Sequence, residues 1–344
     1  MYFGVSAPLT GPLAEYGGYF QQGFGLALEE LNGGGGINGR PIELVWADTQ
    51  SDPKQSVPAA QKFADDARII AELGDFSSTA SMAASPVYER AKLVQYGYTN
   101  SSPVFTNGGQ YMWSPSVSQS SAEVLQTDAV AKYGKRVAVL YLETSWGNDT
   151  YTLFKQEAAK LGLEVAYSAS YLPTTTDFRP LLINARDAHP DLVYDIGYDN
   201  DAAAILNQRS SVDLTTPIFT EQLTAAGIAL AGANAEGALT TSTWFPTSPE
   251  PRVQAFTNAF KAKYGNLPGQ FEVAAYDALN QLAYAVKKGG PTRQGVYDGL
   301  KSATDLPSVQ NGPFQFQEDR RPKPPTPATV VVKDGQLVVV SEQN

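Results

Sequence analysis

The chain has 344 residues, 42% of them hydrophobic, and its 25 basic and 35 acidic side chains give a formal net charge of −10. This length exceeds one typical core and predicts a soluble protein of about two domains, with no apolar run near the roughly 20 residues of a membrane helix. The acidic balance, without a local basic patch, argues against nucleic acid and anionic lipid as partners. The absence of cysteine excludes disulfides, zinc fingers, iron–sulfur sites and thiol catalysis.

Strand-like and helix-like segments alternate along almost the whole chain. The predicted strands are Tyr2–Pro8, Ile42–Ala47, Ile69–Leu73, Val94–Tyr98, Arg136–Leu142, Glu164–Ser170, Leu192–Gly197, Pro217–Thr220 and Ala238–Ser242. One helical stretch has an apolar face formed by Phe20, Phe24, Leu28 and Leu31. Another begins at Asp52-Pro53, an N-cap followed by a proline in the first turn. Repeated βα units predict an α/β fold of parallel sheets with helices on both faces, and ligands beyond the carboxyl ends of the strands.

Three segments rich in proline or serine interrupt this pattern and are predicted to be connectors. They are Trp113–Ser116, Trp244–Pro249 and Arg321–Pro327. The last leads into a predicted hairpin, Thr329–Val332 and Leu337–Val340, with an Asp-Gly turn. Three connectors predict two lobes joined by a three-strand hinge, so that the cleft between them can close. We expect lobe 1 to hold residues 1–117 and 249–325, and lobe 2 residues 118–248 and 326–344.

A buried strand that ends in glycine leads into a helix at Gly74–Thr79. Backbone N–H groups at such a helix start attract a carboxylate or a phosphate without a lysine or arginine. The alternative is that Ser77, Ser78 and Thr79 only cap the helix. This segment by itself leaves both interpretations open.

Residues for catalysis and metal binding are nearly absent. The only histidine, His189, is followed by proline in a predicted turn and does not suggest a triad. Asp199 and Asp201 follow a strand end and could face the cleft, although a helix N-cap at Asn200 or Asp201 is the more economical interpretation. We therefore expect a binding protein with no catalytic residues, no metal and no cofactor.

An ordered set of motifs resembles the periplasmic leucine/isoleucine/valine-binding proteins over essentially the whole chain. The matching segments are 7–17, 34–42, 48–55, Ser145-Trp146-Gly147, 177–182 and 312–316. The resemblance implies a type I periplasmic-binding fold, with two Rossmann-like lobes and a solute trapped between them. It also implies delivery to the membrane permease of an ABC importer, a periplasmic location and a monomer. The chain begins directly with a predicted strand, so we expect either no signal peptide or a mature chain with an added initiator methionine.

The resemblance also implies the groups that bind the two charged ends of an amino acid. The ligand carboxylate falls at the Phe76–Thr79 turn, where Ser78 matches the family serine and Thr79 lies beside it. Ser101 matches a ligand-binding threonine after the next strand, and Thr99 and Asn100 would offer backbone groups. The resemblance implies that Glu221 binds the ammonium group and that Tyr198 lies beside Glu221 in the site. The alternative for Glu221 is a helix N-terminal acid favoured by the helix dipole.

The same resemblance predicts an aromatic side-chain pocket made of Tyr16, Trp146, Tyr276 and Phe271, each of which could as easily be core. Four residues, Asp75, Tyr98, Asn100 and Asp199, are bulkier or more polar than is typical of the family and could admit a polar or basic side chain. The default ligand is a branched-chain or other hydrophobic amino acid. The alternatives are an amide, urea or aromatic acid on the same fold, a cytoplasmic ligand sensor and, last, an enzyme.

Overall fold

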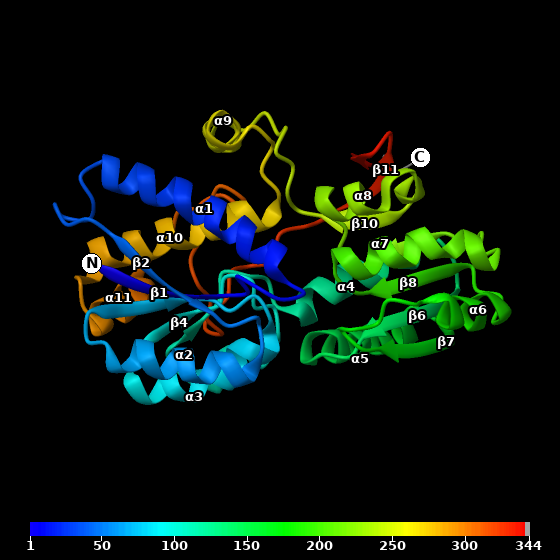
Figure 1. Ribbon diagram of the computed structural model, residues 1–344, viewed down its shortest axis with the longest axis horizontal. Helices are drawn as coiled ribbons and strands as arrows, with labels where there is room; N and C mark the ends of the chain where they lie inside the picture. Colours follow the sequence, from blue (N-terminus) through cyan, green and yellow to red (C-terminus); the bar gives the residue numbers. More distant parts are fainter. Residues whose placement is uncertain (341–344) are drawn as a thin grey trace. The chain divides into compact units, whose positions relative to one another are not determined.

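The computed structural model describes residues 1–340, and its contacts divide the chain into two compact units (Figure 1). The first unit holds Met1–Ser118 and Trp244–Pro325, and the second holds Gln119–Thr243 and the chain from Thr326 onward. The chain therefore crosses between the units at three places. Each unit contains a mainly parallel sheet flanked by helices, which confirms the predicted α/β class.

The first unit is built on a five-stranded parallel sheet in the order β2-β1-β3-β4-β5. Its strands are β1 Tyr2–Ala7, β2 Glu43–Asp48, β3 Ile69–Leu73, β4 Val94–Tyr96 and β5 Met112–Trp113. Its helices are α1 Ala14–Gly33, α2 Pro53–Asp65, α3 Ser78–Ala91, α9 Pro251–Tyr264, α10 Gln270–Gly289 and α11 Arg293–Ser302. Helices α2 and α3 pack together on one face of the sheet, and α1 and α10 pack together on the other (Figure 1).

Local sequence explains where two of these helices lie. Asp52 caps α2 by accepting a hydrogen bond from the Lys54 N–H at 2.9 Å, and Pro53 occupies the first turn, as predicted. In α1 the predicted apolar face is only partly right, because Phe20 and Phe24 are buried but Leu28 and Leu31 are half-buried. The buried face instead continues through Tyr16, Gly23 and Ala27. A Cβ atom on Gly23 would lie 2.2 Å from the Glu272 carbonyl, so this glycine lets α1 approach α10 closely.

The second unit contains a seven-stranded sheet in the order β12-β11-β10-β9-β8-β6-β7. Its strands are β6 Arg136–Leu142, β7 Glu164–Tyr171, β8 Leu192–Ile196, β9 Ile218–Thr220, β10 Leu239–Ser242, β11 Ala328–Lys333 and β12 Gln336–Val339. Its helices are α4 Gln119–Val130, α5 Ser145–Lys160, α6 Arg179–Asp187, α7 Asp199–Gln208 and α8 Ala225–Ala231. The antiparallel β11-β12 hairpin with its Asp334-Gly335 turn forms the sheet edge, as predicted.

One predicted connector is wrong in part. Met112 and Trp113 form β5, the edge strand of the first sheet, where the sequence predicted that Trp113 begins an irregular connector. The strand escaped prediction because two residues are too few to show an alternating pattern. Most other strand ends differ from prediction by one or two residues, which is normal for such assignments.

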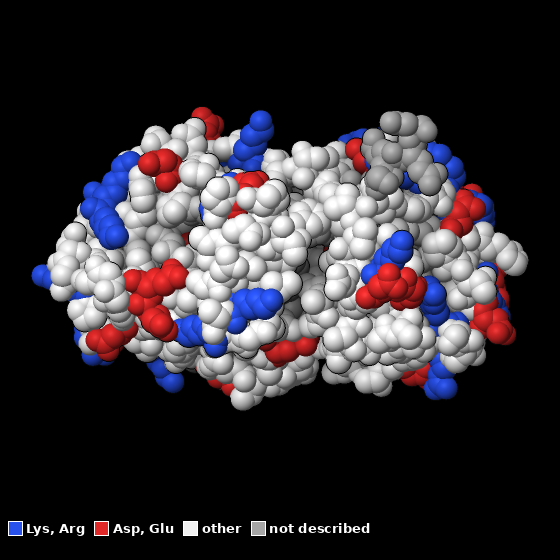
Figure 2. Space-filling model, turned by 90° about the horizontal axis from the view of Figure 1, so that it is seen from above, with Lys and Arg blue, Asp and Glu red and all other residues white. Residues whose placement is uncertain are grey.

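The described residues show neither a membrane-spanning helix nor a metal-binding cluster. None of the helices in residues 1–340 is long and apolar enough to cross a membrane. The described part of the chain also holds no group of three or more His, Cys, Asp or Glu side chains placed to bind a metal ion. Figure 2 shows acidic and basic side chains interspersed over the face drawn there, without a large basic patch.

Candidate ligand-binding site

The loop after β3 in the first unit adopts a conformation that requires glycine. Gly74 has φ +146°, and a Cβ atom at this position would lie 2.3 Å from the Ser6 carbonyl oxygen. An L side chain therefore meets both backbone strain and a collision with β1. This fixes the direction in which the chain leaves β3 and enters α3.

Gly74→Ala is expected to lower the free energy of unfolding by about 2 kcal/mol, because alanine meets a rigid backbone atom. The matched control is Gly18→Ala in α1, where a new Cβ atom meets nothing within 4 Å. That change should leave stability equal or higher, since alanine favours a helix. Urea denaturation of both variants checks the prediction, and equal midpoints for the two would contradict it.

The hydroxyl residues at the start of α3 have different tasks. Ser77 is the N-cap, and its Oγ accepts from the Ala80 N–H at 3.4 Å. Ser78 instead donates its hydroxyl to Asn100 Oδ1 at 3.0 Å, in the loop after β4. Thr79 is half-buried in the first turn of the helix. Capping therefore uses Ser77 alone and leaves Ser78 directed toward the neighbouring strand end.

Asp75 is turned away from this strand end. Its buried carboxylate accepts hydrogen bonds from the hydroxyls of Thr49 and Ser51, in the loop after β2. It also accepts from the backbone N–H groups of Phe76 and Ser77, so these two groups are not free for a ligand. Burial raises the pKa of Asp75, and the hydrogen bonds oppose that rise. Asp75 thus organises the loop and does not signal an unusual ligand.

The loop after β4 provides the second set of predicted binding groups. Thr99 donates its hydroxyl to the Asp75 carbonyl at 3.2 Å, and the half-buried Ser101 hydroxyl has no partner among the described residues. Asn100 is fully buried, and its Oδ1 accepts from Ser78 and, at 3.1 Å, from the Ser102 N–H. Its backbone N–H donates to Gly97, and its carbonyl accepts from Ser114 and Arg321. The backbone of Asn100, which was predicted to face the ligand, is therefore already engaged.

Arg321 stabilises the loop after β4 through hydrogen bonds to its backbone carbonyls. The sequence did not predict this role. Its side chain is 2% exposed, and Nη2 donates to the Ser102 carbonyl at 2.6 Å. Nη1 donates to the Asn100 carbonyl at 2.9 Å, to the Ser116 carbonyl at 3.0 Å and to Ser114 Oγ at 3.2 Å. Burial lowers the pKa of Arg321 to about 10, so the guanidinium stays charged at neutral pH. Its position in a proline-rich stretch predicted only a connector.

Aromatic rings surround the same strand ends. Tyr16 stacks on Phe76 with ring centroids 3.9 Å apart, and Phe271 meets both rings edge-on. Tyr276 does not join them. It packs on Phe256, in the cluster between α1, α9 and α10, and donates its hydroxyl to Glu30. Two of the predicted aromatic residues, Tyr16 and Phe271, thus lie together in the first unit, and Phe76 is an addition.

In the second unit, five side chains meet near the ends of β6, β8 and β9. Trp146, in the first turn of α5, stacks on Tyr198 with ring centroids 4.9 Å apart. Its Nε1 donates to Gln119 Oε1 at 3.4 Å, and Gln119 Nε2 donates to Glu221 Oε1 at 2.9 Å. Glu221 Oε2 accepts from the hydroxyl of Tyr194. The predicted residues Trp146, Tyr198 and Glu221 are therefore brought together, through a glutamine that the sequence did not single out.

Two further acidic residues near Tyr198 stabilise the local backbone by accepting hydrogen bonds. Asp199 is buried, and its carboxylate accepts from the Thr224 N–H at 2.6 Å and the Thr224 hydroxyl at 2.9 Å. Asp201 accepts from the Tyr198 N–H at 3.0 Å, while burial raises the pKa of Asp201 to about 6. The N-cap of α7 is Tyr198, not Asn200 or Asp201 as the sequence predicted.

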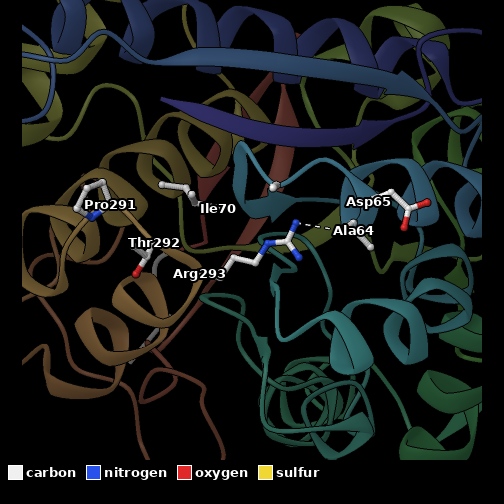
Figure 3. A pocket seen from close by; sticks show the side chains of 7 residues that line it. Ala64, Asp65, Ile70, Pro291, Thr292 and Arg293 are labelled. Atoms are coloured by element: carbon white, nitrogen blue, oxygen red, sulfur yellow. Dashed lines mark hydrogen bonds between the residues drawn. The ribbon is translucent and has the colours of Figure 1, made fainter.

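A separate cavity of about 380 Å³ lies at the opposite, amino end of β3 and contains none of the predicted site residues (Figure 3). Arg293, on its wall, donates to five backbone carbonyls, those of Phe63, Ala64, Asp66, Ile69 and Ala91. These bonds satisfy carbonyls at the ends of α2 and α3 and at the start of β3. The guanidinium group of Arg293 therefore has a structural role, because its donors are bonded to these carbonyls.

Comparison with known proteins identifies the family. The family model described as periplasmic binding protein matches residues 1–336. The chain belongs to this family. Its relatives include the leucine-, isoleucine-, valine-, threonine-, and alanine-binding protein of Pseudomonas aeruginosa, 27% identical over 300 residues that cover 83% of this chain and 78% of the relative.

Two solved structures extend the comparison with periplasmic binding proteins. An ABC transporter substrate-binding protein from Desulfitobacterium hafniense, in complex with Leu, is 26% identical with a TM-score of 0.83 and covers 99% of both chains. A solute-binding protein of an ABC transporter from R. palustris, in complex with benzoate, has a TM-score of 0.90 over 98% of this chain and 95% of its own. At 20% identity, that second likeness shows the fold alone. The predicted resemblance and the type I periplasmic-binding fold class are confirmed, and membership implies an extracytoplasmic location.

Proposed function

We propose that this chain is the solute-binding protein of an ABC importer and that it binds an α-amino acid, by default a branched-chain or other hydrophobic one. The observation that carries the proposal is the environment of Glu221. Its carboxylate is held by the neutral donors Gln119 and Tyr194, next to the stacked rings of Trp146 and Tyr198. A half-buried carboxylate without a cationic partner is suited to an ammonium group.

The first unit offers the complementary chemistry for the carboxylate. Ser78 lies in the first turn of α3, where the helix dipole favours an anion, and the free hydroxyl of Ser101 follows β4. Tyr16, Phe76 and Phe271 form a buried aromatic cluster in the same unit, against which a hydrophobic side chain would pack. The ligand carboxylate is thus bound by the first unit and its ammonium group by the second.

We propose that the chain also has the lobes, the hinge and the permease partner of a solute-binding protein. The two compact units are the two lobes, and the three chain crossings are the hinge about which they close on the ligand. The protein is a periplasmic or lipid-anchored monomer that delivers its ligand to a membrane permease and catalyses no reaction. Leucine and isoleucine are the first ligands to try, because the relative from Pseudomonas aeruginosa and the structure from Desulfitobacterium hafniense bear names that specify such ligands.

Isothermal titration calorimetry tests the proposal with leucine, phenylalanine, γ-aminobutyrate, urea and benzoate. We expect an α-amino acid to bind most tightly. Tighter binding of urea or benzoate would overturn the proposal, because Glu221 would then be buried without a cation or beside a second anion.

Ser78→Ala is expected to weaken leucine binding by about tenfold, because one hydrogen bond to a charged group is lost. The matched variant is Ser77→Ala, which removes the helix cap and should lower the free energy of unfolding by about 1 kcal/mol with a smaller effect on affinity. Calorimetry and urea denaturation of both variants separate the two tasks. If Ser77→Ala reduced the affinity more than Ser78→Ala did, the assignment of Ser78 would be wrong.

A further inference from the structure

A second carboxyl group, that of Glu123, lies beside Glu221 in the second unit. Glu123 follows Gln119 by one turn of α4, and its side chain has no exposed surface. Its Oε1 accepts from Thr127 Oγ1 at 3.3 Å. Nothing in the sequence pattern singled out this residue, because a glutamate in a helix is ordinarily a surface residue.

The two carboxyl groups share their hydrogen-bond donors. Gln119 Nε2 lies 2.9 Å from Glu221 Oε1 and 3.5 Å from Glu123 Oε2. The Tyr194 hydroxyl contacts Glu221 Oε2 and lies 3.3 Å from Glu123 Oε1. Each hydroxyl has only one proton to donate, so Tyr194 cannot satisfy both acids at once. Glu221 has the shorter contacts and is half-buried, whereas Glu123 has only long contacts and is fully buried.

The groups that face this pair bring no positive charge. From α4 they are Gln119, Gln126 and Thr127, from α5 Trp146 through its bond to Gln119, and from β8 Tyr194 and Asp195. The titratable groups among them, Tyr194 and Asp195, are both acids. Two ionised carboxylates in such a place would repel each other, so one of them keeps a proton. Burial and the neighbouring Glu221 raise the pKa of Glu123 well above its ordinary value.

We propose that Glu123 and Glu221 form a carboxyl pair that holds one proton, with the proton on Glu123 and the charge on Glu221. This inference rests on the proposed function for the role of Glu221, and it makes Glu123 a positioning residue that sets the charge offered to the ligand. The pair then accepts a single ammonium group. When that cation binds, it favours ionisation of Glu123, so binding at neutral pH releases part of a proton.

The first test needs no ligand and is therefore independent of the proposed function. An acid whose pKa is raised by folding stabilises the protein below its unfolded-state pKa and destabilises it as pH rises through its folded-state pKa. Glutamine imitates the protonated form and does not titrate. Relative to that of the wild type, the folding equilibrium constant of Glu123→Gln should therefore rise once the pH exceeds the unfolded-state glutamate pKa of about 4.3, by up to about tenfold per pH unit until the folded-state pKa is reached. Parallel pH profiles by urea denaturation would overturn the inference.

The second test uses leucine as the probe. Titrations at pH 7.5 in two buffers with different ionisation enthalpies give the number of protons released on binding. We expect release by the wild type, almost none by Glu123→Gln, and affinities within about threefold of each other. An affinity loss greater than tenfold with unchanged proton release would show that Glu123 is already ionised and would contradict the proposal. If neither protein binds leucine, the proposed function fails, while the denaturation profiles still decide the protonation of Glu123.

Discussion

Glu221→Gln is expected to weaken leucine binding by about 100-fold or more. The change removes the negative charge that receives the ammonium group but keeps the hydrogen bond from Gln119 available to an amide oxygen. Removing one member of a buried charge pair typically costs about 3 kcal/mol or more, which corresponds to this factor. Calorimetry gives the affinity directly. A ligand that lacks the amine should be affected much less.

Two further variants sharpen this prediction. Glu164→Gln changes an exposed carboxylate in the same unit, which pairs with Arg136, and should leave the affinity unchanged. In Glu221→Gln the neighbouring Glu123 is relieved of repulsion and can ionise, which recovers part of the attraction for the ammonium group. The double variant Glu123→Gln/Glu221→Gln should therefore bind more weakly than Glu221→Gln. Undiminished leucine affinity in the double variant would rule out the assignment of Glu221.

Arg321→Met is expected to lower the free energy of unfolding by about 3 kcal/mol or more. The change removes the charged donor from the carbonyl oxygens of Asn100, Ser102 and Ser116, of which the first two keep one other donor each. Each hydrogen bond lost from a charged group costs about 1 kcal/mol or more. Leucine affinity should fall as well, because the loop that carries Ser101 loses its support. Urea denaturation followed by calorimetry measures both effects.

The matched control for Arg321→Met is Arg68→Met in the same unit. Arg68 is 65% exposed and pairs with Asp66, two residues before it in sequence, so its loss should change stability little. Arg321→Lys should fall between the wild type and Arg321→Met, since lysine keeps the charge but cannot reach four acceptors with a planar fork. Equal midpoints for Arg321→Met and Arg68→Met would contradict the role given to Arg321.

The layered α/β fold could be predicted well because the signals for its strands and helices lie in neighbouring residues. Apolar runs such as Ile69–Leu73 and caps such as Asp52-Pro53 depend on neighbouring residues only. The short edge strand β5 was missed because Met112 and Trp113 acquire strand geometry only by pairing with β4. Prediction of the fold therefore failed mainly where pairing, not pattern, decides the structure.

The candidate site was predictable where a strand end met a familiar motif and not elsewhere. Ser78 and Glu221 stand at such positions, where Ser78 bonds to Asn100 and Glu221 to Gln119, and their roles in ligand binding stay predictions. Arg321 and Glu123 act through contacts with residues 71 or more positions away, such as Asn100 for Arg321 and Tyr194 for Glu123, which no spacing rule reveals. Tyr276 packs against the core cluster between α1, α9 and α10, and its place in the ligand pocket stays a prediction.

We propose that this periplasmic binding protein recognises both charged ends of an α-amino acid. Competition calorimetry with leucine, 4-methylpentanoate and 3-methylbutylamine tests it most directly, because the two analogues lack the amine and the carboxylate, respectively. We predict that leucine binds at least 100-fold more tightly than either analogue, since each analogue leaves one set of polar groups without its partner. Binding of 4-methylpentanoate as tight as that of leucine would contradict the account, because Glu221 would then contribute nothing to recognition.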